Sequence, residues 1–507
     1  MNYEIIKTSP ENFSKQALLC SNQGQNKLLA MFAAHEQARD CEFAIYAVFQ
    51  NPAFFAVPLR ILKAEFPTDV YEYPSLTPDI PAAGWYEREI HDMFGLVARN
   101  HPDLRPLVLH ENYPTNIYPL RKSFARDSRL PIERNTVAYP QMGGEGVFEV
   151  PVGPIHAGII EPGHFIFSQV GETVLNLEAK LFFTHRGIEK AVEGLTPEKA
   201  LFMVERICGA CAVSHAISFC QAIESMSEVE VPKTAQAIRV LLAELERLYN
   251  HVGDIGNISA GLAFAPVISG GARLKELLMR ANEMLTGNRF LRNSVILGGV
   301  RVNIKQNKIL ELLELLSKVE SELLQITGSM YNQQEFVDRV ATTGTVPQQT
   351  ALKMVFSGIA ARATGIDTDT RRDFPYLLYP QLDFRVITEH SGDVDARIRV
   401  RIGEVSESIK IIRQATELIL TSDKTELCVE LGELQTATLS IGMSESARGN
   451  NLHAVILDEH GCIERMFVRS ASYSNWPALP VAAPGNIIPD FPLINKSFEL
   501  CYACLDR

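Results

Sequence analysis

Long hydrophobic runs are missing from this chain of 507 residues, although hydrophobic residues make up 46% of it. A membrane-spanning helix needs about 20 consecutive, mostly apolar residues, so no transmembrane helix is expected. The first seven residues, Met1 to Lys7, also lack the basic and apolar regions of a signal peptide. These two absences predict a cytoplasmic protein that meets a membrane, if at all, from its surface.

An excess of positive charge is missing as well. The chain has 48 Lys and Arg against 60 Asp and Glu, which gives a formal net charge of -12. Nucleic acid is bound through a positive field on the protein surface, and the composition supplies no excess of it. A nucleic-acid partner is therefore excluded.

A dense cysteine framework is the third absence. The nine cysteines are odd in number and scattered, which favours metal ligation in a reducing compartment over a set of disulfides. Five of them stand alone and are interpreted as buried thiols without a chemical role: Cys20, Cys41, Cys220, Cys428 and Cys462.

What the chain does have is two C-x-x-C pairs far apart in the sequence. The first, Cys208 and Cys211, lies in R-I-C-G-A-C and is followed by His215; the second, Cys501 and Cys504, is followed by L-D-R. Four thiolates can hold one soft transition metal or a dinuclear centre. The alternative is a structural zinc site, but its ligands usually lie in a compact knuckle rather than at such distant positions.

This combination resembles the large subunit of NiFe hydrogenases, in which R-x-C-G-x-C-x-x-x-H and a C-terminal C-x-x-C hold nickel and iron. The surrounding sequence is most similar to the membrane-bound, energy-converting group 4, the formate hydrogenlyase and hydrogenase-4 type related to respiratory complex I. The resemblance implies that Cys208 and Cys501 are terminal nickel ligands, and that Cys211 and Cys504 bridge nickel and iron. Carbon monoxide and cyanide on iron would be inserted by maturation proteins.

The same resemblance assigns roles to further residues. Glu161, ahead of P-G-H, corresponds to the acid that accepts a proton from the nickel thiolates, first of all from Cys501. Such a proton carrier is expected to be buried, with its pKa raised toward neutrality. His215 would hydrogen-bond to the cysteines. Arg448, in E-S-A-R-G, would lie over the open side of the centre, although Ala447 replaces the usual proline. Glu189 and the last residues would share a structural Mg²⁺ or Fe²⁺ ion.

Residues 1–125, the N-terminal part, are predicted to form a small α/β domain with strands in its first half. Its E-R-E-I-H-D-M-F-G sequence at 87–95 resembles the small peripheral complex I subunit, which implies a docking role. Residues 126–150, rich in Arg, Pro and Gly, predict a linker. Residues 151–507 would form the catalytic domain, mainly helical with small β elements, so the expected fold class is α+β. The predicted strands are 41–49, 54–62 and a strand pair around Gly171, and the predicted helices are 231–252, 273–285 and 309–325.

Several partners follow from the resemblance. Because the chain has no further cysteine grouping, electrons would pass to iron–sulfur clusters of a separate small subunit. A membrane arm related to complex I, and in the formate hydrogenlyase type a formate dehydrogenase, would complete an assembly on the cytoplasmic face of the membrane.

Two departures of this sequence from the hydrogenase pattern leave an alternative function open. Glu499-Leu500 stands where the family has Asp-Pro, and the sequence stops at Arg507, behind which many relatives carry a removable extension. The alternative is a complex I-like subunit without hydrogenase activity, which shapes a quinone or coupling cavity and whose cysteines hold structural zinc or nothing.

Overall fold

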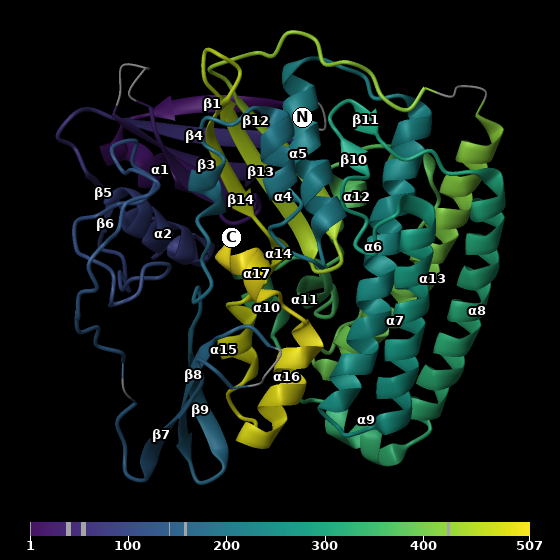
Figure 1. Cartoon of the computed structure of the whole chain (residues 1–507). Coiled ribbons are helices and arrows are strands. Elements are labelled where there is room, and N and C mark those ends of the chain that lie inside the picture. Colours follow the sequence, from purple (N-terminus) through teal and green to yellow (C-terminus); the bar gives the residue numbers. More distant parts are fainter. Residues whose placement is uncertain (1, 37–41, 52–56, 141, 157–159, 423–425) are drawn as a thin grey trace.

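The computed structural model describes residues 2–36, 42–51, 57–140, 142–156, 160–422 and 426–507 (Figure 1). A β-rich N-terminal part precedes a part dominated by long helices, which confirms the predicted α+β class. Within the described residues, none of the helices combines the length and the apolar character needed to cross a bilayer.

The N-terminal part is built on a four-stranded sheet of order β1-β4-β3-β2 (β1 Tyr3–Thr8, β2 Leu28–His35, β3 Phe43–Gln50, β4 Leu59–Phe66). β1 is parallel to β4 and the other pairs are antiparallel. The strand expected at 41–49 is confirmed by β3. Of the strand expected at 54–62, residues 54–56 lie outside the described residues, and its end belongs to β4. Two helices, α1 (Phe13–Ser21) and α2 (Gly84–Phe94), accompany the sheet, and α2 ends at Gly95 in the left-handed conformation that glycine favours.

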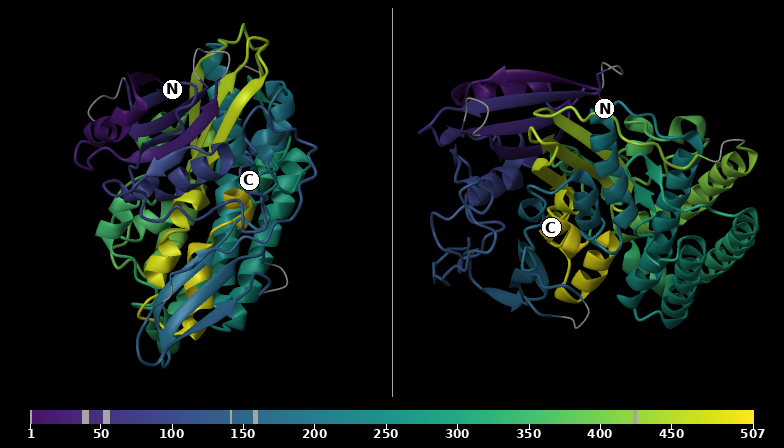
Figure 2. Two further views of the ribbon diagram at one scale, coloured as in Figure 1. Left: turned by 90° about the vertical axis from the view of Figure 1, so that its left-hand side faces the viewer. Right: turned by 45° about the horizontal axis from the view of Figure 1, so that its top comes forward.

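Four long helices stand side by side on the opposite side of the molecule (Figures 1 and 2): α6 (Lys233–Ala260), α7 (Ala265–Thr286), α8 (Gln306–Tyr331) and α13 (Val394–Thr421). The first three confirm the predicted helices. α6 and α7 approach closely where Gly271 faces Gly256, since a Cβ on Gly271 would lie 2.8 Å from the Gly256 Cα. α13 was not predicted.

A three-stranded antiparallel sheet lies between these two parts (β12 Leu439–Ser446, β13 Gly449–Leu457, β14 Ile463–Arg469). One face packs against α5 (Ala212–Met226) and the other against the N-terminal sheet (Figure 1). Phe467 of β14 stacks on Phe32 of β2 with ring centroids 4.8 Å apart. Arg465 and Arg469 donate hydrogen bonds of 3.0 Å to carbonyls of β2. The N-terminal part therefore shares a core with the rest of the chain.

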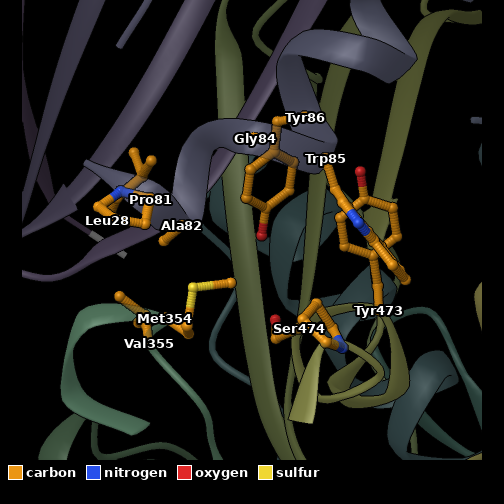
Figure 3. Close-up of a pocket in the computed structure, with 11 residues that line it drawn as sticks. Leu28, Pro81, Ala82, Gly84, Trp85, Tyr86, Met354, Val355, Tyr473 and Ser474 are labelled. Carbon is orange, nitrogen blue, oxygen red and sulfur yellow. The ribbon is translucent and has the colours of Figure 1, made fainter. Parts of the chain in front are cut away.

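The boundary between the two parts is tightly packed. Figure 3 shows Trp85 and Tyr86 of α2 beside Tyr473, which follows β14, around a cavity of only about 50 Å³. The Tyr86 and Tyr473 rings stack with centroids 5.0 Å apart. Such a cavity has room for about one or two water molecules and for no larger ligand.

The described residues of the expected linker have no regular structure until β7 begins at its end. β7 (Val147–Val152) belongs to a three-stranded sheet with β8 (His164–Val170) and β9 (Thr173–Lys180). The β8–β9 hairpin confirms the strand pair expected around Gly171. Of the isolated cysteines, Cys20 and Cys220 are buried as expected and Cys462 is half-buried. The interpretation of Cys428 as buried is wrong, because it lies exposed in a segment without regular structure; Cys41 lies outside the described residues.

Candidate metal centre

The two cysteine pairs meet although the chain separates them widely. Cys208 lies in the loop between α4 (Pro197–Val204) and α5, and Cys211 is the residue that precedes α5. Cys501 precedes the last helix, α17 (Tyr502–Asp506), which contains Cys504. The Sγ atoms of Cys208 and Cys501 are 3.1 Å apart, and one ligand atom each of Cys208, Cys501 and Cys504 lies within 4.8 Å of the others. The geometry is therefore that of a shared thiol cluster.

The electrostatics of this cluster fit a bound cation. Hydrogen bonds from the thiols of Cys211, Cys501 and Cys504 push the pKa of Cys208 well below its ordinary value. The pKa values of Cys211 and Cys501 are raised well above the ordinary value, chiefly because each thiol is hydrogen-bonded to Cys208. A transition metal would stabilise all four as thiolates, and four sulfur donors suit nickel and low-spin iron.

Side chains of α6 hold the first cysteine loop from behind. Glu246 accepts hydrogen bonds from the backbone N–H groups of Val213 (2.6 Å) and Ser214 (3.0 Å) at the start of α5. Asn250 donates to the Ala210 carbonyl at 2.7 Å, and Tyr249 to the Gly209 carbonyl at 3.2 Å. The sequence showed this helix only as an apolar stripe, so these positioning contacts were missed. The signal that could have indicated them is the set of polar residues Glu246, Tyr249 and Asn250 within a helix that the structure buries almost throughout.

His215 lies where the sequence predicts it, against the cysteines. Its Nε2 is 3.6 Å from the Sγ of Cys504, and its Nδ1 is 3.0 Å from Nε2 of His453 on β13. Burial lowers the pKa of His215 to about 4, so the ring is neutral and can donate one N–H while it accepts at the other nitrogen. His453 was missed because a lone histidine in a strand gives no motif.

Arg448 reaches the same centre from the turn between β12 and β13. Its Nε donates to the Glu499 carbonyl at 2.9 Å, and its Nη2 lies 3.1 Å from the Asp254 carboxylate. Burial alone would lower the pKa of Arg448, but Asp254, Cys211 and Glu499 together raise it. Nη1 is buried and has no hydrogen-bond partner among the described residues. A buried cationic donor thus has no partner in the described part of the chain, and the cysteines Cys211 and Cys501 are near enough to help raise the pKa of its guanidinium.

The Glu161 carboxylate contacts the backbone between the two cysteines of the second pair. The N–H of Ala503, between the two cysteines, donates a 2.8 Å hydrogen bond to Glu161 Oε2. The glutamate is exposed on this chain, not buried as a proton carrier in an apolar interior was expected to be. It lies on the loop ahead of β8, at the surface rather than between packed layers. Its position beside the C-terminal cysteine pair is the one expected from the sequence, while its role stays a prediction.

Glu189 also lies where the sequence suggests, close to the last residue, but its surroundings do not fit a divalent cation. Its Oε1 is 2.8 Å from Arg507 Nη1, and its Oε2 is 2.7 Å from Arg465 Nη1. Mg²⁺ and Fe²⁺ need free oxygen ligands, but both oxygens of this carboxylate are already paired with guanidinium groups. The predicted structural metal site is not supported by this donor set.

Three family models match the chain in succession. "Respiratory-chain NADH dehydrogenase, 30 Kd subunit" matches residues 6–129, "Nickel-dependent hydrogenase" residues 186–260, and "Respiratory-chain NADH dehydrogenase, 49 Kd subunit" residues 262–437. These matches cover the N-terminal part, the first cysteine pair and the long helices.

Individual proteins and one solved structure are similar over most of the chain. "Formate hydrogenlyase subunit 5" of Escherichia coli K12 is 30% identical over 95% of this chain and 84% of its own length. "Hydrogenase-4 component G" of the same organism is 33% identical over 88% of this chain and 78% of its own. A chain of a membrane-bound sulfane sulfur reductase, an archaeal respiratory membrane complex, superposes with a TM-score of 0.67 at 26% identity, over 73% of this chain and all of that chain.

Proposed function

Because this chain belongs to the family of group 4 NiFe hydrogenase large subunits fused to a domain like the 30 Kd complex I subunit, we propose that it interconverts hydrogen with protons and electrons at the four-cysteine site. The observation that carries the proposal is the meeting of both C-x-x-C pairs at one buried cluster. A nickel–iron centre bound there, with carbon monoxide and cyanide on iron, would supply the Lewis acid that polarises hydrogen.

The chain's own residues hold this centre and move its protons. Cys208 and Cys501 are proposed as terminal nickel ligands, and Cys211 and Cys504 as ligands shared with iron. Arg448 presents its free Nη1 as a fixed donor toward anionic ligands of the centre, since a guanidinium keeps its charge at any working pH.

Proton release requires a base close to the thiols. Cys501 is proposed as the first proton acceptor and Glu161 as the next, because the glutamate reaches the backbone between the two C-terminal cysteines. His215 keeps the Cys504 thiolate hydrogen-bonded, and His453 fixes the orientation of its ring.

Substitution of the cysteines tests the shared centre. Replacing Cys208, Cys211, Cys501 or Cys504 by Ala, one at a time in the purified complex, should abolish hydrogen turnover and reduce bound nickel, because ligand number and geometry set the site. The matched control is Cys220→Ala, since Cys220 is a buried cysteine of α5 outside the cluster. A ligand variant with near-normal hydrogen turnover would contradict the proposal.

Nickel and iron analysis separates this function from the complex I-like alternative. Relatives whose names place them in an NADH-quinone oxidoreductase are 26–28% identical, so the chain is similar to that branch as well. The thiol cluster favours the hydrogenase. Zinc or no metal in the purified complex would overturn it.

The assembly around the chain follows from its relatives. Because relatives are named as a formate hydrogenlyase subunit and a membrane-bound hydrogenase subunit, the chain is proposed to act at the cytoplasmic face of a membrane complex. An iron–sulfur small subunit would take the electrons, a complex I-like membrane arm would anchor the assembly, and a formate dehydrogenase would supply reductant in the formate-linked form. Co-purification and mass spectrometry of the complex test these partners.

A further inference from the structure

A buried group of four charged side chains lies behind the metal centre and plays no part in the proposed chemistry. Glu89 comes from α2 in the N-terminal part, Glu189 from α3 (Ile188–Ala191), Arg465 from β14, and Arg507 follows α17. Each side chain is at most 8% exposed. We call these residues the charge quartet.

The contacts of the charge quartet form a chain of ion pairs. Arg507 bridges the two glutamates, with Nη2 2.7 Å from Glu89 and Nη1 2.8 Å from Glu189. Arg465 approaches the other oxygen of Glu189 at 2.7 Å. The backbone N–H of Val468 adds a 3.0 Å hydrogen bond to Glu189. Two carboxylates and two guanidiniums make the group electrically neutral, which is the condition for holding charges inside a protein.

Arg507 stands at the point where a cation would otherwise be needed. Two buried glutamates facing one another repel, and either a divalent ion or a guanidinium can compensate them. Arg507 does so with a separate nitrogen for each carboxylate, in the fixed geometry that a guanidinium provides. Its contacts with aromatic rings fill the remaining space, with the guanidinium carbon 5.1 Å from the Tyr473 ring centroid.

The charge quartet also connects the metal ligands to the N-terminal part. Cys504 lies three residues before Arg507 on the same short helical segment. The backbone carbonyl of Arg507 accepts a 2.8 Å hydrogen bond from the N–H of Arg186, next to the loop that holds Asp506. Glu89, in turn, belongs to a helix whose Tyr86 stacks on Tyr473 (Figure 3).

We propose that Arg507 replaces a structural divalent cation in this chain, and that the charge quartet is a metal-independent clamp through which Glu89 of the N-terminal part positions the C-terminal cysteine pair. The N-terminal part is thus a structural support of the segment that carries Cys501 and Cys504, as well as a candidate docking module. The positioning role rests on the proposed function, whereas the clamp itself does not.

Two double-mutant cycles in the purified complex test the clamp. Glu89→Gln and Arg507→Met each leave one uncompensated buried charge and should lower the apparent unfolding temperature by about 5 °C or more. The double variant leaves the neutral Glu189–Arg465 pair and should lose clearly less than the sum of the two. The second cycle, Glu189→Gln with Arg465→Met, should behave in the same way and leaves the C-terminal segment unaltered, in case Arg507→Met does not assemble.

The matched control is Glu72→Gln, since its side chain belongs to the same part of the chain but is 59% exposed. It removes one negative charge and should leave the unfolding temperature unchanged. If the decreases in unfolding temperature were additive in both cycles, the clamp would be overturned. Side chains that act only by packing would not regain stability when the second substitution restores neutrality.

Metal analysis tests the replacement of the cation. The unaltered complex should contain no magnesium, and no iron beyond the active-site and cluster iron, in proportion to this chain. A chelator should not change its unfolding temperature. One chelatable Mg²⁺ or Fe²⁺ per chain, with a fall in unfolding temperature on its removal, would overturn the inference. These results are independent of hydrogen turnover: a complex without nickel would refute the proposed function and leave the clamp intact.

Discussion

Asp254→Asn should weaken both the fold and the centre, because this one carboxylate compensates two buried arginines. Asp254 lies 3.1 Å from Arg448 Nη2 and 3.4 Å from Arg401 Nε, and its side chain is 7% exposed. Asparagine keeps the shape and one acceptor oxygen but removes the charge. Arg401 would then lose its ion-pair partner, and Arg448 would keep only the more distant Glu499 carboxylate, 4.0 Å from its Nη2.

The free-energy cost of Asp254→Asn follows from the burial of the ion pairs that Asp254 forms. Removing one partner of a buried ion pair costs about 3–5 kcal/mol, because the remaining charge stays in the interior. The exposed pair of Asp367 with Arg372 provides the comparison: it is shorter, at 2.7 Å, but its side chains are 63% and 43% exposed. Loss of such a pair costs about 0–1 kcal/mol. Asp367→Asn is therefore the matched control.

The stability effect should depend on pH in a defined direction. Burial alone would raise the pKa of Asp254, but Arg448, His251 and Arg401 outweigh it and hold the pKa below its ordinary value. A depressed pKa means that the carboxylate contributes its full stability at neutral pH and loses it as the pH falls below about 4. The unaltered protein and the variant should therefore differ most near pH 7, and the difference should shrink in acid.

Thermal unfolding of the purified complex at pH 7 measures the effect on stability, and hydrogen–deuterium exchange activity measures the effect on the centre. Asp254→Asn should lower the apparent unfolding temperature by on the order of 4 °C. It should reduce activity by about 10-fold or more, since Arg448 loses one of its two fixed contacts. Unfolding temperatures of Asp254→Asn and Asp367→Asn that agree within experimental error would refute the reasoning.

Two further predictions concern the surroundings of the cysteines. Glu161→Gln should retain nickel and complex assembly but lower hydrogen evolution and hydrogen–deuterium exchange by orders of magnitude, because the amide cannot carry a proton; retention of both activities would remove Glu161 from the proton path. Glu246→Gln should cost about 1–3 kcal/mol and reduce nickel occupancy, because an amide offers only one acceptor oxygen where two carboxyl oxygens each accept an N–H group of α5. Metal analysis and thermal unfolding check this, with Glu228→Gln at the surface as the control, and unchanged nickel would contradict it.

The sequence alone determined the parts that depend on local pattern and motif. The apolar spacing of α6, α7 and α8 predicts helices because each buries a continuous stripe. The cysteine spacing and His215 identify the centre, since four thiols in two pairs are rarely accidental. The turn glycines around β8 and β9 likewise mark a hairpin.

α13 shows why local pattern fails elsewhere in the same chain. It is a 28-residue helix, yet its buried face includes Arg397, Arg401 and Glu404. Charges on the inner face hide the apolar period from which a helix is predicted. They are tolerated there because each finds a partner from a distant segment, as Glu404 does in Arg362 at 2.8 Å.

Only the tertiary structure decided which distant groups meet. His453 completes the contact of His215, and Arg507 joins Glu89 to Glu189. No local spacing encodes these contacts, because each joins residues that are far apart in the sequence and meet only in the folded chain. Ion pairing and metal ligation depend on distances of a few ångströms, and those distances are set by the packed core rather than by position in the chain.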